Sequence, residues 1–183
     1  MGQAITGTVT SKLSPTSTWV MDYNTDFCNA GVNIGSLIQV YSGSAAAQAY
    51  VDDIESCVEF TSGSGTQPSV GDIVTATNAE AVITHIVVTS GSFSNGNAVG
   101  WMNVRAVNKG FSNGDTLTFP SATATCSAFY RNCVLSFSKD TMWSIAGGKS
   151  SCSNGDTYQI CPKEWLDPQP YVATYGTPIP CVS

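Results

Sequence analysis

Short runs of alternating apolar and polar residues recur along the chain, and they predict β-strands. Residues Ala81 to Thr89 form an uninterrupted run rich in β-branched side chains, and Ala98 to Val107 alternates between two sets of side chains as a strand does. Because the intervals between turns are short, they favour antiparallel neighbours over βαβ units. The pattern therefore predicts a mainly β fold, either an antiparallel β-sandwich or a small barrel.

A seven-residue turn phrase recurs three times. The copies are Ser69 to Thr75, Ser112 to Thr118 and Ser153 to Gln159, and Ser94 to Asn97 is a partial copy. In each full copy Gly provides the positive φ of a tight turn and Asp caps the loop, after which a strand begins. We expect hairpin-like turns at these places. Three divergent copies do not establish a solenoid or propeller.

One segment has a different period. Between Ser44 and Phe60, apolar residues recur at helical spacing and acidic residues fall between them. The spacing predicts a short helix over about 44–60. An irregular pair of strands is the alternative, because Gly and Ser flank the segment on both sides.

The C-terminal residues form a segment rich in Cys and Pro. Five prolines between Cys161 and Cys181 oppose helix and interior strand. We therefore expect an N-terminal extended segment (1–20), a β-rich core domain (21–160) and an extended C-terminal arm (161–183). The expected interface residues are the large apolar side chains of this arm: Trp165, Leu166, Tyr171, Tyr175 and Ile179.

Composition narrows the possible partners. Hydrophobic residues make up 42% of the 183 residues and charged residues 11%, and the net charge is −6. Residues 1–100 contain eight acidic residues and one basic residue, Lys12. Nucleic acid is not an expected partner, because binding it requires a basic stripe. No apolar run is long enough to span a membrane, and no secretory signal is expected at the start.

The chain has seven cysteines, and none forms the C-x-x-C pair typical of zinc or redox sites. They are Cys28, Cys57, Cys126, Cys133, Cys152, Cys161 and Cys181. We expect no metal cage. All seven are candidates for disulfides that form after synthesis, and the odd number leaves at least one thiol.

No catalytic residue, cofactor or metal ligand is predicted. His85 is the only histidine, and within an apolar run it is expected to be a half-buried, hydrogen-bonded side chain. Asp72, Asp115 and Asp156 share one position of the repeated turn, which explains them as loop caps. Asp22 to Asp26 resembles the start of a calcium loop, but Phe27 stands where such a loop requires glycine.

The stretch from Val70 to Phe119 resembles the β-rich modules of tailed-phage virion proteins, especially those of aquatic and cyanobacterial phages. Gly-Asp turns open strands in these modules, and Phe111-Ser112-Asn113-Gly114-Asp115-Thr116-Leu117 has the phrase Phe-x-Asn-Gly-Asp-x-Leu. The resemblance covers about 50 residues. Residues 1–60 and the C-terminal segment do not share it.

The resemblance implies a structural protein of the phage virion, made in the host cytoplasm. We expect a capsid decoration or cement protein that stabilises the head by association. Its partners would be the major capsid protein or other virion subunits, with copies of the chain arranged as a homo-oligomer in a symmetric assembly. One alternative is a tail, fibre or baseplate module that binds a host-surface glycan, and a more remote one is a small glycan hydrolase.

Overall fold

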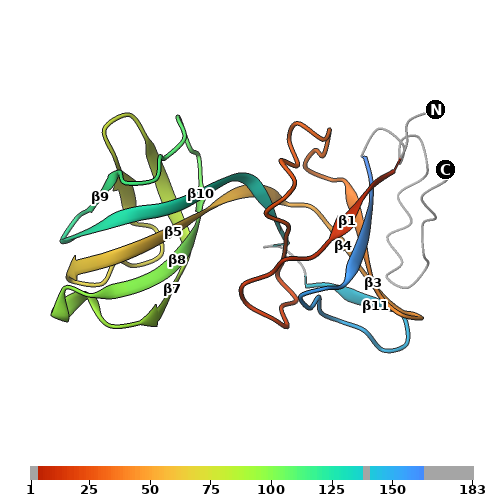
Figure 1. Ribbon diagram of the computed structural model, residues 1–183. Helices are drawn as coiled ribbons and strands as arrows, with labels where there is room; N and C mark the ends of the chain where they lie inside the picture. Colours follow the sequence, from red (N-terminus) through yellow and green to blue (C-terminus); the bar gives the residue numbers. More distant parts are fainter. Residues whose placement is uncertain (1–3, 138–140, 163–183) are drawn as a thin grey trace. The chain divides into compact units, whose positions relative to one another are not determined.

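The computed structural model describes residues 4–137 and 141–162. Strands hold 54% of the described residues and helix 2%, as Figure 1 illustrates. The strands form a closed six-stranded antiparallel barrel and a separate sheet. The predicted mainly β class, with a barrel or sandwich architecture, is confirmed.

The chain divides into two compact units. We call Met1–Ile54 together with Cys133–Ser183 the sheet unit, and Glu55–Asn132 the barrel unit. The barrel unit is therefore an insertion within the sequence of the sheet unit. The expectation was one core domain over 21–160, whereas the structure gives residues 55–132 a unit and a core of their own.

The sheet unit contains a five-stranded antiparallel sheet in the order β1-β12-β3-β4-β11. Its strands are β1 (Ile5–Thr8), β3 (Leu37–Ser42), β4 (Ala45–Tyr50), β11 (Trp143–Ala146) and β12 (Thr157–Cys161). A short strand, β2 (Trp19–Met21), pairs with residues Val134–Ser136 at the end of β10 (Ala122–Ser136). Alternate residues of β3 and β12, such as Val40 and Ile160, lie in the core of this unit.

The barrel unit closes on itself. Its strands follow the order β10-β5-β8-β7-β6-β9, and β9 pairs with β10 to complete the ring. Besides β10, they are β5 (Asp53–Gly65), β6 (Ile73–Thr75), β7 (Glu80–Ser90), β8 (Ala98–Arg105) and β9 (Thr116–Phe119). Closure removes the unpaired strand edges that an open sheet would expose.

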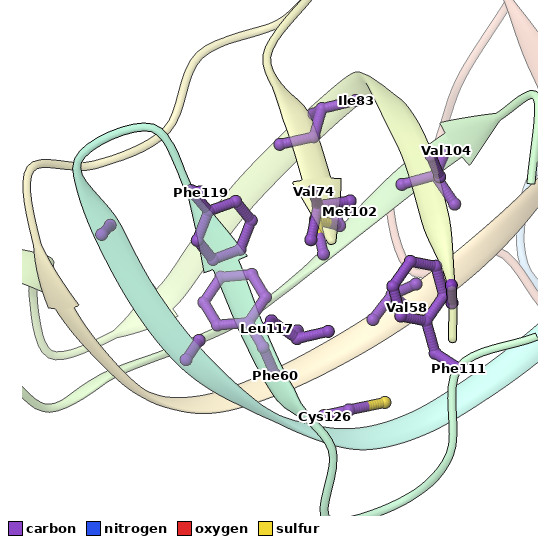
Figure 2. Close-up of a cluster of buried hydrophobic side chains, with 14 of the residues drawn as sticks. Val58, Phe60, Val74, Ile83, Met102, Val104, Phe111, Leu117, Phe119 and Cys126 are labelled. Carbon is purple, nitrogen blue, oxygen red and sulfur yellow. The ribbon is translucent and has the colours of Figure 1, made fainter. Parts of the chain in front are cut away.

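Alternating residues of these strands fill the barrel. Figure 2 shows Phe60, Leu117 and Phe119 gathered with aliphatic side chains from β6, β7 and β8. Phe93, from the 3₁₀ turn η1 (Phe93–Asn95), packs 5.5 Å from Phe60 and 6.2 Å from Phe119, measured between ring centroids. This core is built entirely from residues 58–126, with Val107 and Phe129 packed against it.

The predicted helix over 44–60 is wrong. Residues Ala45–Tyr50 form β4, and β5 begins at Asp53. Ala47, Ala49 and Val51 lie in the core of the sheet unit, whereas Val58 and Phe60 lie in the core of the barrel. The segment contains two strands, each with an apolar residue at every second position, and Asp52 separates them. Because the two strands contribute to different cores, their apolar positions taken together resemble the spacing of a helix.

The three predicted turns are confirmed, and they share one geometry. Gly71, Gly114 and Gly155 have φ of +95°, +91° and +89°. In each turn the Asp backbone N–H donates to the Ser carbonyl three residues earlier, and the Asp Oδ2 accepts from the Ser N–H at 2.8–2.9 Å. Positive φ at the third turn position, with that backbone bond, defines a type II turn.

Each turn also joins its strand to the antiparallel partner in the same way. The Gly N–H donates to the carbonyl of one facing residue, and that residue's N–H donates to the Asp carbonyl. The facing residues are Ile83, Cys126 and Val9 for the turns at Asp72, Asp115 and Asp156. Two turn residues therefore oppose one partner residue, which is a G1 β-bulge.

A fourth copy was not predicted from the sequence. In Asn33-Ile34-Gly35-Ser36, Gly35 has φ of +90°, and it and Ser36 exchange the equivalent backbone hydrogen bonds with Val51. The Ser36 Oγ accepts from the Asn33 N–H at 3.2 Å, in place of the Asp carboxylate. The partial copy at Ser94–Asn97 is instead the 3₁₀ turn η1, closed by a 2.9 Å hydrogen bond from the Ser92 N–H to the Asn97 Oδ1.

We predict that Gly114→Ala lowers the free energy of unfolding by about 1–2 kcal/mol, because a residue with a Cβ atom is strained at positive φ. No atom lies within 4 Å of the Cβ that would be added, so the cost is conformational rather than steric. Gly114→Asn should lose less, since Asn tolerates the left-handed region. Urea unfolding measures all variants, with Asn113→Ala as the control. Equal stabilities for the Ala and Asn variants would contradict the assigned backbone geometry.

Candidate functional site

His85 lies in β7 and faces Asn103 of β8 directly. Its ring centroid is 5.5 Å from that of Trp101, with 38° between the planes. Burial lowers the pKa of His85, so the imidazole is neutral at pH 7. A neutral, half-buried ring packed on an indole fits the structural role expected for this residue.

The outer face of the barrel around His85 contains an unusual buried amide. Cys57, Asn103 and His85 form one row across β5, β8 and β7, and all alternate with core residues. Asn103 is fully buried, and neither its Nδ2 nor its Oδ1 has a hydrogen-bond partner among the described residues. A buried amide without a hydrogen-bond partner lowers the free energy of unfolding, because the loss of its hydration is not compensated. The effect of Asn103 on stability can therefore be tested by substitution.

The aspartates of the repeated turns serve as caps, as predicted. Their carboxylates accept from the backbone N–H groups of Ser69, Ser112 and Ser153. Asp156 also pairs with the Lys149 Nζ at 2.6 Å, and both side chains are at most 10% exposed. Lys149, although it follows two glycines, is thus bound to a turn of its own unit.

The acidic loop at Asp22 also has a structural role. The Asp22 carboxylate accepts from the Asn24 N–H and the Thr25 hydroxyl at 2.9 Å, and from the buried Tyr158 hydroxyl at 2.7 Å. Burial, together with the Asp22 carboxylate, raises the pKa of Tyr158. These bonds account for Asp22 without a cation. No group of three or more His, Cys, Asp or Glu suited to a metal occurs among residues 4–137 and 141–162.

The six cysteines that the structure describes divide into two chemical states. Cys28, Cys57, Cys126, Cys133 and Cys152 are thiols, and Cys161 is disulfide-bonded. Burial raises the pKa of Cys126 to about 11 and that of Cys152 to about 12, with the nearby Asp115 and Asp156 carboxylates adding to the effect. Cys28 is exposed.

The predicted interface residues Trp165, Leu166, Tyr171, Tyr175 and Ile179 lie outside the described residues, as does Cys181. Of the expected C-terminal arm, the structure describes only Cys161 and Pro162.

A set of exposed apolar side chains was not predicted from the sequence. They are Leu13, Ile34, Val70, Ile73 and Val99, of which Val70 at 63% and Ile34 at 57% are the most exposed. Ile34 and Val70 occupy the second position of their type II turns, where the other two turns have Asn113 and Asn154. Because the same backbone bonds form with Asn at this position, the turn geometry alone does not require an apolar side chain there. The signal in the sequence was this change of residue type within the repeat.

Comparison with protein-family models, curated proteins and solved structures finds no match to this chain. Within the described part of the chain, no helix has the length and apolar character needed to cross a bilayer.

We predict that iodoacetamide at pH 8 modifies Cys28 and spares Cys126 and Cys152. A thiol whose pKa is about 11 is ionised only to roughly 0.1% at this pH, and burial blocks access as well. Mass spectrometry of the cysteine-containing peptides reads the result, and alkylation in urea serves as the control. Rapid native modification of Cys126 or Cys152 would contradict the assigned burial.

We predict that Asn103→Leu raises the free energy of unfolding by about 1–2 kcal/mol, because it replaces an unsatisfied amide with an apolar group of similar size. Asn103→Asp should be strongly destabilising, since it buries a charge. Thermal and urea unfolding measure both variants. A loss of stability in the Leu variant would mean that the amide is satisfied by an ordered water.

Proposed function

We propose that this chain is a structural protein of a phage virion that acts by protein–protein association, as a capsid decoration or cement protein of the head. The observation that carries the proposal is the exposure of two apolar side chains, Ile34 and Val70, at a turn position where the two other copies of the turn have Asn. Because hydrogen bonds already fix the backbone of both turns, little backbone freedom is lost when their apolar side chains are buried against a partner, which supports a role in association.

The roles of the ionisable side chains support the same proposal. Asp22, Asp72, Asp115 and Asp156 all accept hydrogen bonds that hold loops or turns in place. The one histidine is neutral and packed on Trp101. A protein that works by association needs no reactive group, and this use of its carboxylates fits such a role.

The Gly-Asp turns on which the resemblance to phage virion proteins rests also stabilise the fold, as a subunit of a capsid would require. The turns at Asp72 and Asp115 fix the short strands β6 and β9 of the barrel unit, so the surface that this unit offers to a neighbouring subunit is well defined. In the proposed assembly the partners are the major capsid protein or other virion subunits, and copies of this chain repeat with the symmetry of the head.

The glycan-binding alternative requires an exposed aromatic platform. Trp101, next to His85 and opposite Glu59, is only 4% exposed. This residue therefore offers no stacking surface for a sugar.

Separating heads from tails tests the proposal. We expect the protein on DNA-filled heads at a fixed ratio to the major capsid protein and absent from purified tails, as measured by quantitative mass spectrometry. The Ile34→Asn, Val70→Asn double variant should fold normally but bind heads at least tenfold more weakly in a re-addition assay. Finding the protein only on tails would overturn the capsid assignment, and finding it on neither would overturn the virion assignment.

A further inference from the structure

The five-stranded sheet of the sheet unit has buried side chains on both of its faces. One face belongs to the core of the unit, where Val40, Ala47 and Ile160 lie. Side chains that alternate with these along β3, β4 and β12 point to the opposite face, which we call the second face. Five side chains of the second face are at most 5% exposed: Leu37, Gln39, Ala46, Gln48 and Cys161. The second face of an antiparallel sheet meets water unless something covers it, so this face has a cover other than the core.

The strand register brings these side chains together. Gln48 of β4 faces Gln39 of β3, and Leu37 of β3 faces Cys161 of β12. Leu37 and Cys161 belong to neither hydrophobic core of the described residues. The Nε2 of Gln48 has no hydrogen-bond partner in the part of the chain that the structure describes, although the residue is only 1% exposed. A suitable cover therefore provides both an apolar contact and a hydrogen-bond acceptor.

Cys161 indicates where the cover is attached. It is the last residue of β12, its side chain lies on the second face, and it is disulfide-bonded. Five other cysteines are thiols: Cys28, Cys57, Cys126, Cys133 and Cys152. Cys181 is the one remaining cysteine of the chain. Because the two Cα atoms of a disulfide lie within about 7 Å of each other, the partner of Cys161 has to reach this face.

The segment between Cys161 and Cys181 is long enough to cross the second face and return. It has nineteen residues, 162–180. From β12 over β3 and β4 to β11 there are three strand spacings, about 14 Å in all. Half of the segment spans about 30 Å when it is extended. Its five prolines have no N–H and oppose pairing as an interior strand, so backbone carbonyls remain available as acceptors for Gln48.

We propose that Cys161 and Cys181 form an intrachain disulfide and that residues 163–180 dock on the second face of the chain's own sheet. The large apolar side chains of this segment, which were expected to contact a neighbouring subunit, then cover Leu37 within the same chain. Formation of the bond removes two protons and two electrons from the two thiols. A disulfide oxidant such as oxidised glutathione accepts them and is released as two thiols. The inference goes beyond the proposed function and does not depend on it.

Peptide mapping without reduction tests the bond. After the free thiols are alkylated in urea, trypsin releases residues 150–163, which contain Cys161, and residues 164–183, which contain Cys181. We expect mass spectrometry to find these two peptides joined, and the unreduced chain to run as a monomer in denaturing electrophoresis. An alkylated Cys181, or its link to another cysteine peptide, would overturn the pairing. A covalent dimer that a reductant separates would identify a second copy as the partner and overturn the proposal.

Cys181→Ser and Cys28→Ser form a matched pair of variants. In urea without a reductant, iodoacetamide should label the five thiols of the wild-type chain. We expect one more labelled thiol in Cys181→Ser, because Cys161 loses its partner. Cys28→Ser should have one fewer than wild type and keep the joined peptides. An unlabelled Cys161 in Cys181→Ser would contradict the pairing.

Contacts measured by NMR test the docking itself. Leu37 and Val40 are both fully buried and lie on opposite faces of β3. In the full chain labelled with ¹³C, the methyl protons of Leu37 should show nuclear Overhauser contacts to residues 163–180. Those of Val40 should show contacts only to the core of the sheet unit. Contacts from Leu37 that are confined to residues 4–162 would overturn the docking.

The outcomes separate this inference from the proposed function. Neither the peptide map nor the methyl contacts involve virions, so their failure leaves the virion assignment standing. Absence of the protein from heads and tails overturns the proposed function but leaves the disulfide and the docked segment as measured.

Discussion

The structure depends on one hydrogen-bonding pattern, the type II turn with a G1 bulge. Four copies fix the register of four antiparallel pairs: β3 with β4, β6 with β7, β9 with β10, and β12 with β1. A slip of one residue would exchange core and surface faces along a strand. The constraint matters most for β6 and β9, which have three and four residues but close the barrel.

The sequence was sufficient to predict the β class and three of these turns, because Gly-Asp before a β-branched run has a local physical cause. It was not sufficient for the turn at Gly35, where Ser36 stands in place of Asp and its hydroxyl oxygen accepts the hydrogen bond from the Asn33 N–H. The helix predicted over 44–60 was wrong. That segment leaves one core and enters another, and only contacts distant in sequence decide which core each residue joins.

The candidate site was predictable only in part. Asp72, Asp115 and Asp156 were expected to be caps, and His85 to be half-buried, because their local sequence contains the reason. A shallow surface pocket of the sheet unit is lined in part by Cys28, Ile34 and Ile54, and no local pattern in the sequence relates these three residues. The burial of the Asn103 amide likewise depends on three neighbouring strands. Solvent exposure depends on the tertiary structure. An apolar residue in a turn motif can therefore be identified as a surface residue only when its neighbours in the fold are known.

The same turns connect folding to the proposed association. In the turns at Asp115 and Asp156, the second position holds an exposed Asn. In the turns at Gly35 and Gly71, the same backbone presents Ile34 and Val70 to solvent without adding flexibility. A residue whose backbone is already held in place loses little backbone freedom on binding, so more of its buried area contributes to affinity. In the proposed association, one backbone geometry would therefore serve two purposes: it fixes strand register in all four turns, and in two of them it also offers an apolar side chain to a partner.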